Sequence, residues 1–234
     1  MSVTTCICSN FLCFKKMTNL EAGISKTFLY FAYGSNMLSF RMKLNNLSAE
    51  FVSIARLDNS RLDFIRYSKF WGGPAATVVP TANAHVWGVI WRIPIDNLDR
   101  LNDQEGLERK IYYAKFVQVL TPYLGILSCR IYIQTINPLP IGDKDEIPVE
   151  RWPSWTYRKV LILGAIEQQL PPYYIEMLKN IKSNGQKGCY KMYCYLMQYT
   201  SSKKSCLCIS EKAVKKPLQL DLRKIRARKL KKAK

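Results

Sequence analysis

The segment Phe28-Leu29-Tyr30-Phe31-Ala32-Tyr33-Gly34-Ser35-Asn36 carries the strongest structural signal in this sequence. Residues 28–32 are aromatic or apolar and indicate a buried β-strand. Turn-forming residues follow, and residues 37–44 are predicted to form a short helix with Ser35 or Asn36 as its N-cap. A strand, a glycine turn and a helix start bring several backbone N–H groups together. This segment is therefore a candidate binding site for a carboxylate or an oxyanion.

Several short runs with strand character follow this segment and are separated by turn-forming residues. The runs lie at 51–57, 61–67, 75–79, 85–93, 111–120 and 126–136. Asp58-Asn59 and Pro80-Thr81-Ala82-Asn83 are typical of turns, so we expect the strands on either side of each to be separate. Pro122-Tyr123-Leu124-Gly125 is typical of a hairpin loop between the last two runs.

Helical periodicity is present at 95–103, 154–169 and 172–181. Glu105-Gly106 ends the first of these helices, and Leu170-Pro171-Pro172 separates the other two. The predicted fold is therefore mixed α/β (α+β), a compact barrel-like sheet with flanking helices. We assign this domain to residues 27–182, which is within the usual size range for one domain.

The formal net charge of the 234-residue chain is +19, which by itself suggests nucleic-acid binding. The charge is uneven, because residues 28–182 carry only +4 and residues 183–234 carry +13. The central region thus has the charge balance of an ordinary domain. The Cys-containing, basic tail at 183–234 is expected to be a flexible segment. Within it, residues 190–199 are apolar enough for a strand or a partner-binding element. Contact of the tail with nucleic acid or an acidic membrane is the alternative.

The cysteines lie mostly outside the central region, which contains only Cys129. They cannot cross-link the core by disulfide bonds, so we expect a reducing compartment. Their spacings are not those of zinc ligands, so we expect no metal. Residues 1–26 lack basic residues before their apolar part and are expected to be a disordered leader. No apolar run approaches the roughly 20 residues needed to cross a bilayer.

Glu105, within Asn102-Asp103-Gln104-Glu105-Gly106, is a candidate for proton transfer. A carboxylate at the end of a short helix can project into a cleft, where burial raises its pKa toward neutrality. On charge alone Asp103 and Glu108 are equally eligible, and an exposed helix end is the simpler interpretation. The chain has one His, no nucleophile elbow and no glycine-rich phosphate loop. An enzyme with these residues would use acid–base chemistry on a substrate that supplies its own nucleophile.

Phe28 to Asn36 closely resembles the opening motif of the gamma-glutamylcyclotransferases, and Asn102 to Gly106 resembles the segment that holds the catalytic glutamate of that family. Further similar positions occur in the family order at Val86–Trp91, Tyr112, Arg130, Tyr132, Pro153-Ser154, Tyr157, Gly164-Ala165 and Leu170–Tyr174. The resemblance covers about Phe28 to Lys182. Asn36 favours this branch over the glutathione-specific relatives, whose motif continues with Leu. The Cys-rich head and the basic tail depart from the family pattern.

The resemblance implies a cofactor-free reaction in which a γ-glutamyl amino acid becomes 5-oxoproline and a free amino acid. Glu105 would act as general acid and base. The resemblance implies that substrate binds to Tyr30, Phe31, Ala32, Tyr33, Gly34, Ser35 and Asn36, with Tyr112, Tyr132 and Tyr157 lining the cleft. It also implies a homodimer in the cytoplasm.

Two other functions stay open at this point. One is a glutathione-specific cyclotransferase. The other is a non-catalytic binding protein on the same fold, whose basic tail contacts nucleic acid or an acidic membrane; this alternative predicts salt-sensitive binding that requires the tail.

Overall fold

The structure is a computed structural model that describes residues 26–44, 46–138 and 147–205. The chain divides into two compact units, Met1–Cys194 and Tyr195–Lys234, and the fold described below is that of the first. The basic run at 212–234 and, apart from Lys26, the expected leader lie outside the described residues. Within the described ranges, no helix has both the length and the apolar character needed to cross a membrane.

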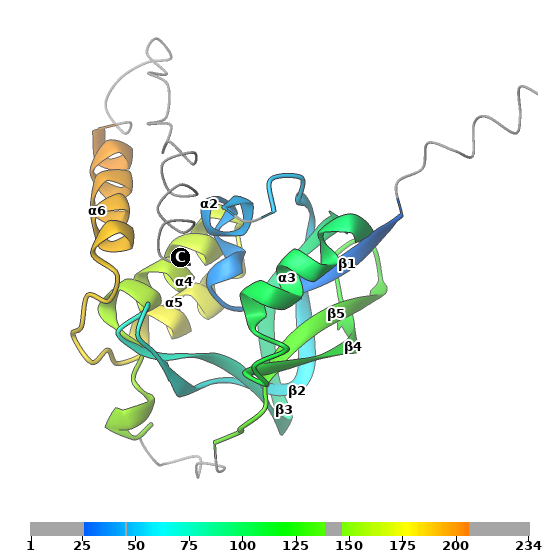
Figure 1. Cartoon of the computed structure of the whole chain (residues 1–234), viewed down its shortest axis with the longest axis horizontal. Coiled ribbons are helices and arrows are strands. Elements are labelled where there is room, and N and C mark those ends of the chain that lie inside the picture. The colour runs from blue at the N-terminus through cyan, green and yellow to red at the C-terminus, as the bar shows by residue number, and fades with distance from the viewer. Residues whose placement is uncertain (1–25, 45, 139–146, 206–234) are drawn as a thin grey trace, which may run out of the picture. The chain divides into compact units, whose positions relative to one another are not determined.

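Five strands form a closed barrel (Figure 1). The strands are β1 (Thr27–Ala32), β2 (Glu50–Ser68), β3 (Gly73–Pro94), β4 (Tyr112–Leu120) and β5 (Ile126–Gln134), in the spatial order β1-β3-β2-β4-β5. A parallel pairing of β1 with β5, at Tyr30 and Arg130, closes the barrel, and the other neighbouring strands are antiparallel. The predicted barrel-like sheet with flanking helices is therefore confirmed.

β2 and β3 are longer than predicted, because each joins two of the expected strands. The pairing between them shifts just after Asp58, and the turn-forming residues lie at this irregularity. Asn59 and Asn83 have φ angles of 53° and 61°, in the left-handed region that asparagine tolerates. The Asn83 N–H donates to Asn59 Oδ1 at 3.4 Å. The expectation of separate strands is wrong here, because the turn residues form a bulge within a continuous ribbon.

The segment after β1 also differs from the prediction of one helix over 37–44. It forms η2, a 3-10 turn at Ser35–Met37, and α2 (Ser39–Lys43). The side chains of Ser35 and Asn36 make no capping hydrogen bond, and that of Asn36 bonds residues of β1 and α3 instead. Gly164 packs against this segment, since a Cβ at that position would lie 2.7 Å from the backbone nitrogen of Leu38.

The short helix that carries Glu105 ends where the sequence predicts. η3 (Ile95–Asn97) leads into α3 (Leu98–Glu105). Gly106 has a φ of 68°, the left-handed conformation common at helix C-termini, and its N–H donates to the carbonyl of Asp103 at 3.1 Å. The chain therefore turns toward β4 directly after Glu105, which becomes the last residue of the helix.

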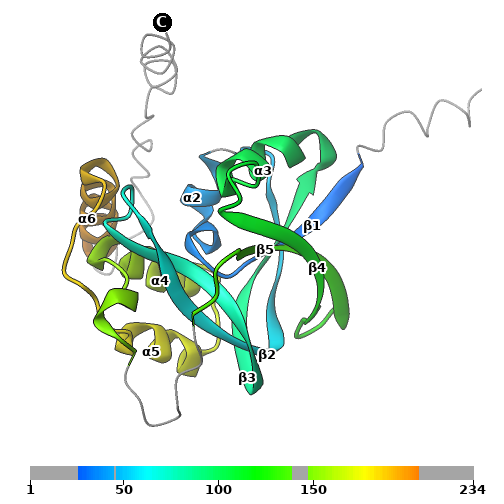
Figure 2. The ribbon, with the colours of Figure 1, turned by 60° about the horizontal axis from the view of Figure 1, so that its bottom comes forward.

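Two longer helices lie beside the barrel (Figure 2). α4 (Trp155–Glu167) begins after Ser154, whose Oγ accepts a hydrogen bond from the Tyr157 N–H at 3.1 Å. Ser154 is therefore the N-cap of this helix. α5 (Pro172–Asn180) starts with a proline, which suits the first helical position because that residue needs no N–H donor. Both predicted helices are confirmed.

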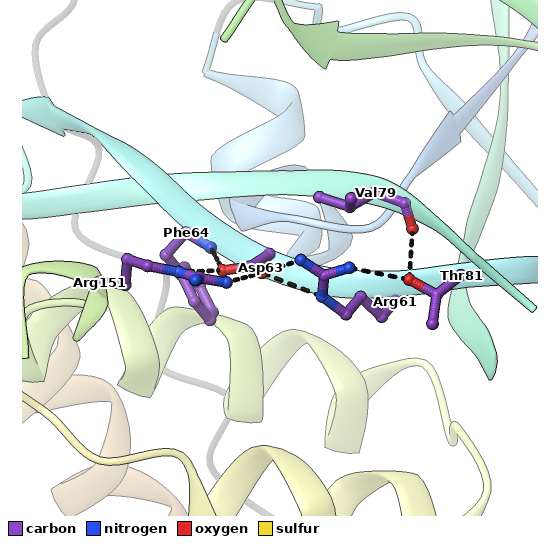
Figure 3. Close-up of polar contacts among 6 residues, drawn as sticks. All are labelled: Arg61, Asp63, Phe64, Val79, Thr81 and Arg151. Carbon is purple, nitrogen blue, oxygen red and sulfur yellow. Dashed lines mark hydrogen bonds and ion pairs between the residues drawn. The ribbon is translucent and has the colours of Figure 1, made fainter. Parts of the chain in front are cut away.

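Asp63 is the centre of a buried ion cluster that joins β2 to η4 (Val149–Arg151) (Figure 3). Its side chain is 1% exposed and forms ion pairs with both Arg61 and Arg151. Asp63 Oδ1 also accepts the Phe64 N–H at 2.7 Å. A buried carboxylate is tolerated only when its charge and lone pairs are matched in this way. The cluster fixes the segment that precedes α4 onto the barrel.

The chain after α5 remains in contact with the barrel. The Trp155 N–H donates to the Gln186 carbonyl at 2.9 Å, and the Cys189 N–H donates to the Phe70 carbonyl at 2.7 Å. The second of these bonds holds the loop between β2 and β3. Residues 184–189, which lie within the segment expected to be a flexible tail, therefore help to fix a loop that borders the cavity described below.

The expectation of a strand at 190–199 is wrong, because these residues belong to α6 (Tyr190–Ser205), which crosses the boundary between the two units. The Tyr193 N–H donates to the Cys189 carbonyl at 3.0 Å, which is the helical spacing. A short apolar run does not distinguish a strand from a helix by its pattern alone.

Candidate active site

A cavity of about 370 Å³ lies where η2, α2 and α3 meet the barrel and the loop between β2 and β3. It is lined by Tyr30, Tyr33, Gly34, Ser35, Asn36, Arg41, Arg66, Tyr67, Ser68, Phe70, Trp71, Ala75, Ala76, Gln104, Glu105, Arg109, Ile111, Tyr112, Tyr132 and Tyr157. The lining residues come from segments that are distant in sequence. The volume suits a small polar molecule rather than a macromolecule.

Most of the residues predicted for the site meet at this cavity. The opening segment contributes Tyr30 and Tyr33 to Asn36, α3 contributes Glu105, and β4, β5 and α4 each contribute a tyrosine. Phe31 and Ala32 do not line it, because both are fully buried in the core. These two residues therefore stabilise the strand that carries the turn, without facing the cavity.

Glu105 is fixed by the side chain of Asn36. The Asn36 Nδ2 donates to Glu105 Oε1 at 3.0 Å and to the Tyr30 hydroxyl at 3.1 Å. Asn36 Oδ1 accepts from Gln104 Nε2 at 3.2 Å, and the Asn36 carbonyl accepts from Trp91 Nε1 at 3.0 Å. These contacts set the amide orientation, so its N–H groups are available to the carboxyl oxygen.

Burial distinguishes Glu105 from the two other acidic residues that, on charge alone, were equally eligible for proton transfer. Asp103 and Glu108 are exposed, whereas Glu105 is partly buried and faces the cavity. Burial raises the pKa of Glu105 to about 7, and the positive charge of Arg41 and the hydrogen bond from Asn36 oppose this increase. At neutral pH the carboxyl group is therefore divided between its ionised and protonated forms.

Three of the cavity tyrosines have hydroxyl groups that are held by hydrogen bonds to the barrel or to α3. Tyr33 donates to the Tyr132 carbonyl at 2.6 Å, and the Tyr132 hydroxyl donates to Asn102 Oδ1 at 2.8 Å. The Tyr112 hydroxyl donates to the Ala76 carbonyl at 3.1 Å. Burial raises the pKa of each of the three, to about 12 for Tyr132, so all stay neutral near pH 7.

The Tyr157 hydroxyl has a different arrangement, because backbone N–H groups donate to it. The Ala76 N–H donates to this oxygen at 3.0 Å, and the Ser35 backbone also hydrogen-bonds it. A hydroxyl has two lone pairs and one proton, so two incoming bonds leave its own O–H free to donate into the cavity. Burial raises the pKa of Tyr157 to about 12, which keeps that proton in place at neutral pH.

Several residues of the cavity are not predicted from the sequence. Arg41 comes from α2, Gln104 precedes Glu105, and Arg66, Phe70 and Trp71 border the loop between β2 and β3. Gln104 could have been found from its position next to Glu105. The others carry no local pattern, because an Arg on a short helix and aromatic residues in a loop are common on ordinary surfaces.

The chain matches known proteins over the region that builds this site. Residues 85–178 match the AIG2-like family. The Gamma-glutamylcyclotransferase of Mus musculus is 39% identical over 167 residues, which are 70% of this chain and 83% of the mouse protein. The protein of the same name from Homo sapiens is 38% identical with the same coverage. A solved structure named Gamma-glutamyl cyclotransferase has a TM-score of 0.66 at 34% identity, covering 74% of this chain and 99% of the other.

These similarities show the family: the chain belongs to the gamma-glutamylcyclotransferases. An uncharacterized protein from Homo sapiens has a solved structure with the same fold, at 35% identity and a TM-score of 0.65, covering 73% of this chain and 98% of that one. The expected family and its barrel fold are thus confirmed.

Proposed function

We propose that this protein is a gamma-glutamylcyclotransferase that converts a γ-glutamyl amino acid into 5-oxoproline and the free amino acid. The observation that carries the proposal is the Glu105 carboxyl group, held by Asn36 in a tyrosine-lined cavity with a pKa of about 7. Such a group can accept one proton and later donate one. The relatives at 39% and 38% identity carry the name of the same reaction.

In the proposed reaction, ionised Glu105 removes a proton from the α-ammonium group of the substrate. The freed amine attacks the γ-carbonyl carbon, and a five-membered ring with a tetrahedral oxyanion forms. Protonated Glu105 then delivers its proton to the nitrogen of the scissile amide. The carbonyl re-forms as the carbon–nitrogen bond breaks, and Glu105 returns to its ionised state. The second proton of the ring nitrogen passes to the released amine through Glu105 or solvent, so the products are the neutral lactam and the ammonium form of the amino acid.

Tyr157 is the proposed donor to the developing oxyanion. Its O–H proton is the only hydrogen-bonding capacity that the bonds from Ala76 and Ser35 leave unused. A fixed donor of this kind typically raises kcat by about 10²–10³-fold. The turn at 33–36 would hold the glutamyl part beside it.

Two effects supply most of the expected rate. An intramolecular attack in the correct conformer can contribute about 7–11 kcal/mol, because the reacting groups are already joined. General acid–base help from Glu105 adds about 10²–10⁴-fold. No cofactor is needed for either effect. The residues proposed for the reaction all lie within 27–182, the region assigned to catalysis.

The experiment that tests this function is an assay of 5-oxoproline release from γ-glutamyl-alanine. The wild-type protein should turn over, and Glu105→Gln should lose activity while it keeps its circular dichroism spectrum. Asp103→Asn is the matched control, because Asp103 is an exposed acid of the same helix. Turnover that survives in Glu105→Gln at the wild-type rate would remove Glu105 from the mechanism.

The same assay with intact glutathione separates the two candidate substrate classes. We propose γ-glutamyl amino acids as substrates, because the segment Tyr33-Gly34-Ser35-Asn36 has Asn where the glutathione-specific branch has Leu. A higher kcat/KM for glutathione than for γ-glutamyl-alanine would reverse this assignment. From the family resemblance we further propose a cytoplasmic homodimer that acts in glutathione metabolism.

The tail supports a separate proposal of binding to nucleic acid or an acidic membrane, because residues 183–234 carry a net charge of +13. The association should weaken steeply with salt. It should also disappear on truncation after Ser205, which removes the basic run at 212–234 and keeps residues 184–189 in contact with the barrel. Binding that is unchanged in the truncated protein would contradict a role for the tail.

A further inference from the structure

Arg41 brings a cationic group to the same cavity as Glu105. It lies on α2, and its side chain lines the cavity. The guanidinium carbon is 5.6 Å from the ring centroids of both Phe70 and Trp71. Those rings belong to the loop between β2 and β3, so they fix the orientation of the guanidinium group. The attraction of a cation to an aromatic face contributes to this packing.

Within the part of the chain that the structure describes, Arg41 has a hydrogen-bond donor that no other residue uses. Its Nε is fully buried and has no hydrogen-bond partner, and among the residues that the structure describes its guanidinium group forms no ion pair. Asp63 shows the opposite case, since its two arginine partners are both engaged by a carboxylate. Arginine stays charged in proteins, so burial without a carboxylate partner is costly.

Glu105 does not fill the role of that partner. Its charge acts on Arg41 at a distance, without a salt bridge, and its own carboxyl group is partly protonated near pH 7. Burial lowers the pKa of Arg41 and the field of Glu105 raises it, with burial the larger effect. The guanidinium group is therefore an oriented, desolvated cation beside the proposed reacting centre.

We propose that Arg41 binds a carboxylate of the substrate. This inference rests on the proposed function, because γ-glutamyl amino acids carry two carboxylates, one on the glutamyl part and one on the leaving amino acid. A planar guanidinium group pairs with a carboxylate through parallel N–H bonds, which fixes position as well as charge. Arg41 would thus bind a carboxylate of the substrate, while Glu105, held by Asn36, exchanges protons with the reacting nitrogen.

The test compares two substrates that differ in one carboxylate. γ-Glutamyl-alanine has both carboxylates, whereas γ-glutamyl-ethylamine has only that of the glutamyl part. The variant Arg41→Gln should raise KM and lower kcat/KM by about 10- to 100-fold, the usual effect of losing a charged hydrogen bond. An equal loss for both substrates assigns Arg41 to the glutamyl carboxylate. A loss confined to γ-glutamyl-alanine assigns it to the leaving amino acid.

Lys43→Gln is the matched control. It removes one positive charge from an exposed position of the same helix, and it should leave KM unchanged for both substrates. Arg41→Lys keeps the charge but not the planar group, so its loss should be intermediate. If Arg41→Gln has the KM of Lys43→Gln for both substrates, the proposal is overturned.

A pH profile provides a second readout that a purely structural role would not change. Glu105 is faced by Asn36 (η2), Arg41 (α2), Tyr30 (β1), Tyr112 (β4), Tyr132 (β5) and Tyr157 (α4), with Tyr33 nearby. The charge of Arg41 lowers the pKa of Glu105. The Arg41→Gln variant should therefore move the acid limb of kcat/KM to higher pH, and an unmoved limb would contradict the coupling.

Direct binding separates this proposal from the proposed function. Calorimetric titration of 5-oxoproline, γ-glutamyl-ethylamine and γ-glutamyl-alanine into Glu105→Gln requires no turnover. If Arg41 holds the glutamyl carboxylate, adding Arg41→Gln to Glu105→Gln should weaken the binding of all three ligands. If Arg41 holds the carboxylate of the leaving amino acid, only the binding of γ-glutamyl-alanine should weaken. Unchanged affinity for all three ligands in a variant with the wild-type unfolding temperature would overturn the assignment, whatever the assay of 5-oxoproline release shows.

Discussion

The side-chain amide of Asn36 donates to the carboxyl oxygen of Glu105 at 3.0 Å, although the two residues are 69 positions apart. Asn36 follows the first strand of the barrel, and Glu105 ends a helix between the third and fourth strands. The bond stabilises the ionised carboxylate, so it lowers the pKa of Glu105 against the larger opposing effect of burial. This pair links the turn after β1 to the candidate proton-transfer group.

Replacing Asn36 with alanine should reduce the ionised fraction of Glu105 by removing this donor. Because the lost bond favours the ionised form, the pKa of Glu105 should rise, and the acid limb of kcat/KM should move to higher pH. We expect activity at pH 6 to fall by about tenfold or more. Asn97→Ala removes an asparagine that bonds Ser48 outside the cavity and should leave the profile unchanged. An acid limb in Asn36→Ala at the wild-type position would contradict the assigned role.

Burial of Glu105 should also be visible as a pH-dependent stability. Its pKa is about 7 in the folded protein against an ordinary value of 4.5, so the folded state holds more protons between these pH values. Stability is therefore lost as the pH rises through this window. Glu105→Gln should stabilise the fold at pH 8 by up to about 3 kcal/mol and by little at pH 4.5.

Chemical denaturation of wild type and Glu105→Gln at both pH values checks this prediction. Asp103→Asn, on the exposed side of the same helix, should show no such pH-dependent difference. A stability difference between wild type and Glu105→Gln that is the same at pH 4.5 and pH 8 would be inconsistent with a raised pKa.

Tyr157→Phe should lower kcat more than it raises KM. The variant loses the O–H donor and leaves the N–H groups of Ala76 and Ser35 without their acceptor. We expect a decrease in kcat of about 10²-fold or more, measured by steady-state release of 5-oxoproline. Tyr113→Phe is the control, because Tyr113 is a half-exposed residue of β4 that does not line the cavity. Equal kcat values for the two variants would argue against an oxyanion donor.

Asp63→Asn should destabilise the fold without touching the site. The substitution leaves the partly buried Arg61 and Arg151 without their shared carboxylate (Figure 3), which typically costs about 3–5 kcal/mol of unfolding free energy. Asp58→Asn breaks an exposed pair with Arg56 and should cost less than about 1 kcal/mol. Urea denaturation measures both, and similar values for the two variants would show that the cluster at Asp63 is not structural.

The local elements of the fold were predictable because their signals lie within a few residues. The apolar run at 28–32 became β1, the runs around Gly125 became a hairpin, and Ser154 and Pro172 mark helix starts as expected. Glu105 could be singled out through a motif whose residues are adjacent. For the strands and helices the physical cause, side-chain periodicity or hydrogen bonding at a helix end, acts between neighbours in the chain.

Tertiary contacts decided the rest. Asn59 and Asn83 look like chain reversals, yet in the barrel they form a bulge, because the pairing on both sides of it continues. The sequence could not distinguish Glu105 from Glu108 by charge, since only closure of the barrel buries one and exposes the other. Arg41 had no local signature at all. Its importance follows from the cavity it shares with Glu105, and a shared cavity is a property of packing between distant segments.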